Sequence, residues 1–326
     1  NLISKNKSEH HKYWQIIGPE KDLGLVKTIN KFKLLLKNSI LRHSISDRDI
    51  SILLSGGFDS NTILDLYVKL NKKKTDTFTY DFTSNKFSEL SKAKKVAKEF
   101  GVKNFSTVVD YKYILNNIDK IIFELESPFT SIRLFGLRSV FELMSKMNKK
   151  VVFEGGGGDE ILGGYRYNFI NHLLDKSLKK KDNNLMNDLH MQSRSLTDFH
   201  SLIKTILFQN DSTKDCNVFF DETIFNKDFY QEYKYTKNLK LNFNKKINFL
   251  KNSQLIDIEE VNLPRSLKYM DKLAMNQNIE NRVPFLDEEL AKFCFNLKNK
   301  YKFSGNQSRY VLKKNFQNNK LNKFLT

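Results

Sequence analysis

The fold is decided by the segment Ile52-Leu53-Leu54-Ser55-Gly56-Gly57-Phe58-Asp59-Ser60, in which an apolar run stops at a Ser-Gly-Gly turn. A helical pattern follows from Asn61 to Leu70. A strand, a glycine turn and a helix N-terminus together form an anion site, because backbone N–H groups and the positive end of the helix dipole point at one place. The hydroxyl groups of Ser55 and Ser60 add donors, and Asp59 offers a carboxylate to a magnesium ion.

This turn differs from the two common nucleotide-binding loops. No Gly-Lys-Ser/Thr follows it, as a Walker A loop would require, and it lacks the GxGxxG spacing of a dinucleotide turn. The alternative is an ordinary connection between a strand and a helix that contains two glycines. The choice between an anion-binding loop and an ordinary turn therefore depends on what accompanies it elsewhere in the chain.

Strand-like and helix-like segments alternate through the first 155 residues. The apolar patterns predict strands at Ile50–Leu54, Thr77–Phe82, Asn104–Val109 and Lys150–Phe153. They predict helices at Val26–Ile45, Asn61–Leu70, Ser88–Phe100 (closed by Gly101), Tyr111–Leu125 and Leu134–Met147. Such alternation indicates an α/β fold with a parallel sheet, which binds ligands at the carboxyl ends of its strands.

The character of the sequence changes after Tyr165, where helical spacing dominates and no convincing β-alternation is found. For residues 178–260 we expect helices joined by variable loops. Polar residues, Gly18-Pro19 and Gly24 indicate a linker remnant over residues 1–26. We therefore expect one domain over residues 27–326, with an α/β part at 27–165 and a mostly helical part at 166–326.

The composition excludes some classes of protein and leaves others open. The chain has 326 residues and a formal net charge of +18, but nine of its 55 basic residues are arginines and the lysines are dispersed. Arginine is the preferred residue for phosphate and base edges, so a solvated lysine surface is favoured over a nucleic-acid groove. No apolar run approaches the roughly 20 residues that a membrane span requires.

The two cysteines, Cys216 and Cys294, allow neither a disulfide framework nor a cysteine zinc cluster. Cys294 lies in an apolar run and is expected in a core. The first residues carry no apolar signal segment. These observations predict a reducing, cytoplasmic compartment.

A second glycine-rich loop follows the strand predicted at Lys150–Phe153. It reads Glu154-Gly155-Gly156-Gly157-Gly158-Asp159-Glu160, followed by Ile161-Leu162-Gly163-Gly164-Tyr165. Four successive glycines indicate a backbone that bends sharply and lies close to a ligand, although a flexible surface loop is the alternative. Asp159 follows these glycines as Asp59 follows the first pair, so two strand ends can share one magnesium ion between phosphate oxygens.

The third informative stretch runs from Asp271 to Asp287 and ends in Glu280-Asn281-Arg282-Val283-Pro284-Phe285-Leu286-Asp287. By itself it predicts a helix, an irregular connector and a second helix that starts near Pro284. Met275 and Phe285 are more typical of a core than of a site. Glu280 and Arg282 have the alternative of being an ordinary ion pair.

Taken together, the three stretches resemble the synthetase domain of the asparagine synthetase family, which includes β-lactam synthetases and lasso-peptide cyclases. In that family an SGGxDS loop, a GxGxDE-xxxGY segment and an ExRVPFLD segment occur in this order, as they do here. Phe87-Ser88-Glu89 and Tyr310-Val311-Leu312-Lys313 add to the resemblance, which covers roughly residues 27–317. It implies a fold of the ATP pyrophosphatase type (PP-loop, adenine-nucleotide α-hydrolase-like) and a glutaminase domain ahead of the linker.

The resemblance also implies a reaction. A carboxylate, aspartate in the type case, is adenylated by ATP with release of pyrophosphate, and ammonia derived from glutamine then displaces AMP to give an amide. By resemblance, the adenylate would be lined by Leu54, Tyr80, Glu154 and Gly155, and pyrophosphate would be held by Ser55, Gly56, Gly57, Asp59 and Ser60. Asp59 and Asp159 would bind Mg²⁺, Arg309 would take the place of the family's catalytic lysine, and Asp271, Glu280 and Arg282 would shape the second-substrate pocket.

Two departures from the family pattern bear on the chemistry. The family usually has a polar residue, often Glu, at the position of Gly156, where it aids the amine step, and a glycine has no side chain for proton chemistry. Arg309 keeps the positive charge of the family lysine but cannot lose a proton. These changes leave adenylation in place and put ordinary asparagine formation in doubt.

Several alternatives therefore remain open from the sequence. The acceptor carboxylate could be a sugar acid or a peptide, and a module that binds ATP without turnover is a further alternative. A tRNA-modifying ATP pyrophosphatase shares the first loop, but the second and third stretches argue against it. The expected partners are ATP, the carboxylate substrate and ammonia, with no nucleic acid and no membrane, and a homodimer stays open.

Overall fold

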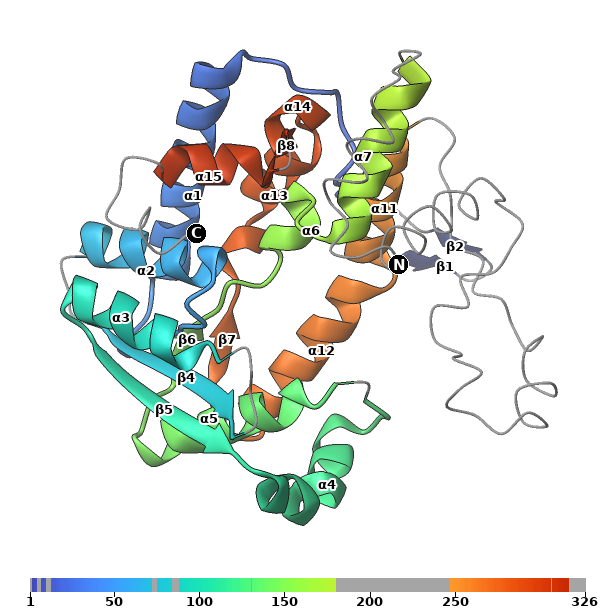
Figure 1. Cartoon of the computed structure of the whole chain (residues 1–326). Coiled ribbons are helices and arrows are strands. Elements are labelled where there is room, and N and C mark those ends of the chain that lie inside the picture. The colour runs from blue at the N-terminus through green and yellow to red at the C-terminus, as the bar shows by residue number, and fades with distance from the viewer. Residues whose placement is uncertain are drawn as a thin grey trace, which may run out of the picture.

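The computed structural model describes residues 2–4, 7–9, 13–71, 75–83, 88–129, 131–179, 247–305 and 307–316. The prediction for residues 178–260 falls mostly outside these ranges, as do Cys216 and Phe87. Figure 1 shows a twisted sheet with helices on both sides and a group of helices beyond its carboxyl end. This arrangement agrees with the predicted α/β fold and its mostly helical second half.

The central sheet has five strands in the order β5-β4-β3-β6-β7, and all neighbours are parallel. Its strands are β3 (Ile50–Leu53), β4 (Asp76–Phe82), β5 (Lys103–Val109), β6 (Val151–Phe153) and β7 (Glu280–Arg282). The chain builds outward from β3 through β4 to β5 and then returns to the other side of β3 with β6. A topological switch point therefore lies between β3 and β6, where parallel sheets of this kind open a crevice.

Four of these strands match the predicted ones to within one residue at each end, but β7 was missed. We expected an irregular connector at Glu280–Arg282, whereas this segment pairs with β6 at the sheet edge, Val151 beside Glu280 and Phe153 beside Arg282. A strand of three polar residues has no apolar alternation, so periodicity could not reveal it.

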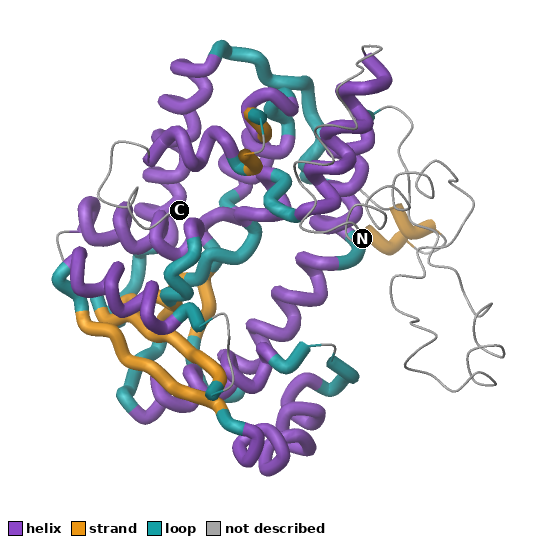
Figure 2. The backbone as a smooth tube through the Cα atoms, in the orientation of Figure 1, coloured by secondary structure: helices purple, strands orange, loops and turns teal. Residues whose placement is uncertain are grey.

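Both faces of the sheet are covered by helices (Figure 2). The first half of the chain supplies α1 (Leu25–His43), α2 (Phe58–Asn71), α3 (Leu90–Phe100), α4 (Tyr111–Leu125) and α5 (Arg133–Lys146). The predicted cap at Gly101 is confirmed, because this residue ends α3 with the left-handed φ of 64°. The predicted helices agree with these bounds to within a few residues.

The second half is mostly helical where it is described. Its helices are α6 (Gly158–Leu162), α7 (Arg166–Lys179), α11 (Phe249–Glu259), α12 (Asn262–Met275), the 3₁₀ turn η1 (Pro284–Leu286), α13 (Glu288–Phe295), α14 (Asn299–Lys302) and α15 (Tyr310–Phe316). Two small hairpins pair β1 (Leu2–Ser4) with β2 (Lys7–Glu9) and β8 (Phe303–Ser304) with β9 (Gln307–Ser308). None of the described helices is long and apolar enough to cross a membrane.

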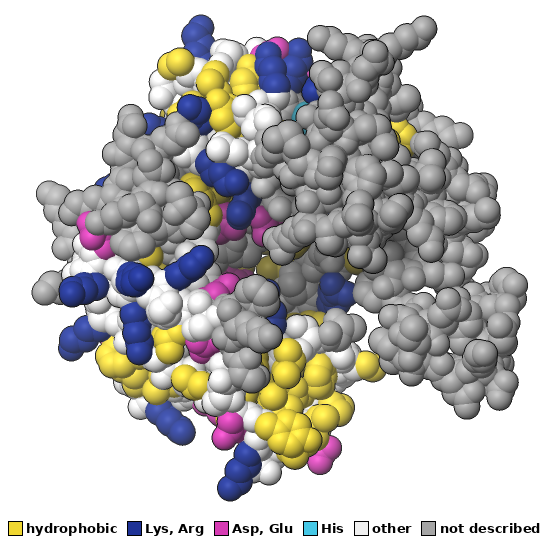
Figure 3. Space-filling model, in the orientation of Figure 1, with side chains coloured by type: hydrophobic (Ala, Val, Ile, Leu, Met, Phe, Trp, Pro, Cys, Tyr) yellow, Lys and Arg dark blue, Asp and Glu magenta, His cyan; other side chains and the backbone are white. Residues whose placement is uncertain are grey.

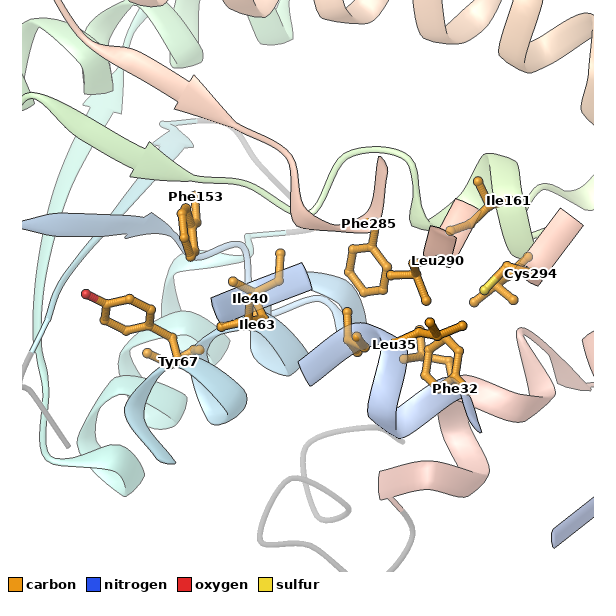
Figure 4. Packing of buried hydrophobic residues seen from close by; sticks show 14 of the residues in the cluster. Phe32, Leu35, Ile40, Ile63, Tyr67, Phe153, Ile161, Phe285, Leu290 and Cys294 are labelled. Atoms are coloured by element: carbon orange, nitrogen blue, oxygen red, sulfur yellow. The ribbon is translucent and has the colours of Figure 1, made fainter. Parts of the chain in front are cut away.

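Two apolar cores lie on opposite faces of the sheet because side chains alternate along each strand. Val151 and Phe153 of β6 join the larger core with α1, α2 and α13, whereas Val152 joins a second core with α4, α5 and α12. Figure 4 shows part of the larger core, in which Phe153 and Tyr67 meet edge to face with ring centroids 5.6 Å apart. Cys294 is buried in this core, as predicted.

The other core expectations are confirmed in part. Phe285 is fully buried, but Met275 at the end of α12 is 54% exposed. Residues 16–21 lie against the end of α13: the Gly18 N–H donates to Asn296 Oδ1 at 2.8 Å, and Ile16 is buried. The predicted domain boundaries at residues 26 and 165 stay a prediction.

Candidate active site

The first glycine loop, residues 55–57, connects β3 to α2 and is held by its own serine hydroxyls. The Ser55 N–H donates to Ser60 Oγ at 3.2 Å, and the Gly57 N–H donates to Ser55 Oγ at 3.1 Å. Gly56 has a φ of 73°, and a Cβ there would lie 2.7 Å from Lys92 Cβ, so the turn requires glycine at this position. Asp59 therefore stands in the first turn of α2, where the helix dipole favours negative charge.

The second glycine loop, residues 155–158, lies directly on the first. A Cβ at position 155 would be 3.0 Å from Asp59 Cβ and 3.1 Å from the Ser60 nitrogen, and a Cβ at position 158 would be 3.0 Å from Asp59 Cγ. Side chains at these two positions would push the loops apart. Gly155 and Gly158 are thus explained by close contact with Asp59, and the two loops lie side by side.

Asp59 and Asp159 meet at a single nitrogen atom. Arg309 Nη1 lies 2.6 Å from Asp59 Oδ2 and 2.9 Å from Asp159 Oδ1. The arginine comes from the residue before α15, far along the chain, and its φ of 54° is in the left-handed region that a non-glycine residue rarely adopts. Backbone strain of this kind is typical of residues held at functional sites.

The two carboxylates are ligands of the kind that could hold a magnesium ion. Both lie close enough to one nitrogen atom to share one cation, and Asp59 Oδ1 is buried with no hydrogen-bond donor among the described residues. The described ranges contain no group of three or more His, Cys, Asp or Glu residues that could hold a metal. Magnesium commonly takes one or two carboxylates and completes its shell with water and substrate phosphates.

The groups around Asp59 shift its pKa in opposite directions. Burial raises the pKa of Asp59, Arg309 opposes this shift and Asp159 adds to it. Lys313 lies on α15, one turn after Arg309, and its charge also acts on the two carboxylates. Burial lowers the pKa of Lys313. Figure 3 shows acidic side chains near the middle of the face in view, with Lys and Arg dispersed around them.

Tyr80 lies near the carboxyl end of β4 and packs against α5. Its ring lies so close to α5 that a Cβ at Gly136 would be 2.1 Å from Tyr80 Cδ2. Arg133 Nε donates to the Tyr80 hydroxyl at 3.3 Å, and burial raises the pKa of this hydroxyl. Leu54 is buried at the end of β3, where its carbonyl accepts from Thr79 Oγ1 at 2.6 Å.

The three residues predicted for the second-substrate pocket do not converge. Glu280 and Arg282 pair with each other through Oε1 and Nε at 2.7 Å, and Arg282 Nη1 also donates to the His43 and Ile45 carbonyls at 2.5 and 2.7 Å. These contacts place the Arg282 guanidinium at the carboxyl end of α1. Glu280 and Arg282 therefore form an ion pair, which was the alternative to a role in a substrate pocket. Asp271 lies exposed on α12. Their assignment to a substrate pocket therefore stays a prediction without geometric support.

Sequence reasoning missed other residues beside the second glycine loop. Side chains alternate along β7, so Asn281 lies on the opposite face of this strand from Glu280 and Arg282. Its Nδ2 donates to Glu154 Oε1 at 2.9 Å. Glu160 is buried, accepts from the Tyr165 hydroxyl at 2.6 Å and has its pKa raised by burial. Asn281 could have been found from strand alternation had β7 been predicted.

The strand order and the paired glycine loops define an α/β protein whose two glycine loops meet at the switch point of a parallel sheet. The chain belongs to the asparagine synthase family, which matches residues 31–322. It is 25% identical over 304 residues to asparagine synthetase [glutamine-hydrolyzing] 1 of Bacillus subtilis, an alignment that covers 88% of this chain and 46% of the relative. Over 144 residues it is 28% identical to the human asparagine synthetase [glutamine-hydrolyzing], covering 42% of this chain and 26% of that one.

The chain thus spans about half the length of the full-length curated relatives that it matches. Among solved structures, an NH3-dependent NAD synthetase from Campylobacter jejuni aligns with a TM-score of 0.29 and 17% identity, over 44% of this chain and 61% of that one. The U34-tRNA thiolase NcsA from Methanococcus maripaludis aligns with a TM-score of 0.33 and 13% identity, over 77% and 79%. These scores are low, and the fold is defined by the strand order itself.

Proposed function

We propose that this chain is the synthetase part of an ATP-dependent, amide-forming carbon–nitrogen ligase. One observation carries the proposal: Asp59 and Asp159, from the ends of neighbouring strands, approach one cation position beside the Ser55–Gly57 loop. Membership of the asparagine synthase family supports it. The substrates would be ATP, a carboxylate (aspartate in the type case) and ammonia, which a glutaminase would release from glutamine.

The residues suit release of pyrophosphate. A carboxylate oxygen of the acceptor attacks the α-phosphorus of ATP, the bond to the bridging oxygen breaks and pyrophosphate leaves with the electron pair. N–H groups and hydroxyls of residues 55–60 would bind the leaving phosphates, and Arg309 and Lys313 would offset their negative charge. Asp59 and Asp159 would hold Mg²⁺, which supplies charge stabilisation to the phosphoryl oxygens when bound.

The acceptor carboxylate is the open part of this function. Gly156 stands where the family usually has a polar side chain, and this departure supports a second candidate: an amide-forming enzyme that acts on another acid, such as a sugar acid or a peptide. A cytoplasmic location belongs to the same proposal.

The test is a product analysis with ATP, Mg²⁺, ammonium chloride and a panel of acids that starts with L-aspartate. We expect acid-dependent release of AMP and pyrophosphate, detected by phosphorus NMR or a coupled pyrophosphate assay. The acid that gives the largest stimulation identifies the substrate class. Formation of ADP and phosphate alone, or no dependence on any acid, would contradict the proposal.

A further inference from the structure

The Glu154 carboxylate lies beside the place where a side chain at position 156 would begin. A Cβ built on Gly156 would be 3.1 Å from Glu154 Oε1 and 3.3 Å from Val283 Cγ1. Gly156 is not among the described glycines with positive φ, so its backbone could accept another residue. The Glu154 carboxylate, two residues earlier in the chain, therefore lies next to the space that a side chain at position 156 would occupy.

Glu154 is held in this position from two sides. Its backbone N–H donates to the Arg282 carbonyl at 3.1 Å, which continues the pairing of β6 with β7. Its Oε1 accepts from Asn281 Nδ2 at 2.9 Å, which leaves Oε2 without a donor among the described residues. The next residue, Gly155, touches Asp59, so the carboxylate lies one residue from the contact between the two loops.

The surroundings of Glu154 suit a group that accepts a proton near neutral pH. Burial raises its pKa to about 7, the hydrogen bond from Asn281 opposes the shift and the nearby Glu160 adds to it. A general base is most effective when its pKa is close to the working pH, because the base must be ionised and still bind a proton well.

We propose that Glu154 is the general base of the amine step and does the proton chemistry that Gly156 cannot. This role rests on the proposed function. Ammonia attacks the acyl carbon of the acyl-adenylate and a C–N bond forms, the attacking nitrogen gives one proton to Glu154 Oε2, and the C–O bond to AMP breaks with the electron pair leaving on the phosphate oxygen. The proton on Glu154 then passes to solvent.

The test separates the two half-reactions in the full chain. With the best acid of the panel, Glu154→Gln should lower acid-dependent exchange of pyrophosphate into ATP far less than it lowers amide formation, because glutamine keeps the shape of a side chain expected to line the adenylate and adenylation does not need the base. Ammonia-dependent amide formation should fall by about 10²–10⁴-fold. Hydroxylamine is uncharged and more nucleophilic at neutral pH, so hydroxamate formation should be reduced far less.

Two further variants control the result. Glu142→Gln removes a comparable half-buried carboxylate on α5, which accepts from Tyr113 of α4 and Arg138 of α5, and should leave both half-reactions unchanged. Glu154→Gln combined with Gly156→Glu places a carboxylate two residues further on and should restore part of the ammonia-dependent rate. Circular dichroism of each variant checks that the fold is retained.

The outcomes distinguish the two proposals. If Glu154→Gln forms amide from ammonia as fast as the wild type, or if exchange falls by the same factor as amide formation, the assigned role of Glu154 is overturned. If the wild type shows no acid-dependent exchange at all, the proposed function is overturned and the role of Glu154 with it.

Discussion

Gly155 lies against Asp59, at a distance that would bring a Cβ at position 155 within 3.0 Å of the Asp59 Cβ. This contact joins two loops that are about a hundred residues apart in the chain. It also explains why the backbone after β6 carries no side chain at this point. The spacing of the loops, and with it the position of Asp59, depends on the absence of one methyl group.

Gly155→Ala should separate the two loops and reduce acid-dependent pyrophosphate release by about 100-fold, because small displacements of catalytic groups are costly. Overpacking should lower the free energy of unfolding by about 1–3 kcal/mol. Both are measured by a pyrophosphate assay and urea unfolding. Gly18→Ala is the matched control, since its nearest neighbours are at an ordinary 3.5 Å. Equal activity of both variants would contradict the proposed contact.

Asp59→Asn should reduce pyrophosphate release by at least about 100-fold, because a charged group that acts on the transition state is removed without a change of shape. The melting temperature should change little, since Arg309 keeps Asp159 as a partner at 2.9 Å. Turnover and circular dichroism are measured on the same sample. A variant with undiminished turnover would show that Asp59 has no catalytic role.

Arg309→Met should leave Asp59 and Asp159 close together without their shared cation. We expect the free energy of unfolding to fall by about 1–3 kcal/mol, because both carboxylates lose a charged partner. Mg²⁺ should then raise the melting temperature of this variant more than that of the wild type, as the ion replaces the guanidinium. Thermal unfolding with and without MgCl₂ measures both effects.

Arg42→Met is the control for Arg309→Met. Arg42 also pairs with two carboxylates, Asp287 at 2.7 Å and Glu289 at 3.3 Å, but its side chain is 47% exposed and neither carboxylate belongs to the proposed cation position. Its loss should cost less than about 1 kcal/mol and give no added response to Mg²⁺. A similar Mg²⁺ response in both variants would argue against a cation position between Asp59 and Asp159.

Lys302 gives a prediction about pH. It is fully buried, donates to Gln254 Oε1 and the Phe295 carbonyl at 2.7 Å each, and burial lowers its pKa from 10.5 to about 7. Between these two values the unfolded chain binds more protons at this site than the folded chain, so the stability contributed by this residue rises with pH. Below about pH 7 Lys302 is protonated in both the folded and the unfolded chain, so its contribution to the free energy of unfolding no longer changes with pH.

The measurement is the difference in free energy of unfolding between the wild type and Lys302→Met at pH 7.5 and 9. The wild type should gain stability relative to the variant by at most about 1.4 kcal/mol per pH unit. Comparing the two proteins removes the contribution of groups that titrate in both. A difference that is constant with pH would mean that Lys302 is charged in the folded protein.

The sequence by itself determined the strands that have apolar side chains, the helices between them and the two glycine loops at strand ends. Ile50 and Ile52 of β3, and Val151 to Phe153 of β6, could be placed because buried strands need apolar residues, and Gly101 because a left-handed helix end favours glycine. The order of the three motifs was enough to predict the family and the pair Asp59 and Asp159.

Tertiary structure decided what local pattern does not encode. β7 forms because the neighbouring β6 offers an unpaired edge, not because Glu280, Asn281 and Arg282 favour a strand, and its register turns Asn281 to Glu154 and Arg282 to the end of α1. Arg309 reaches Asp59 across 250 residues of sequence because the hairpin before α15 places it there. Such contacts depend on how segments that are far apart in the sequence pack against each other. The spacing of residues along the sequence does not show which of them meet in space.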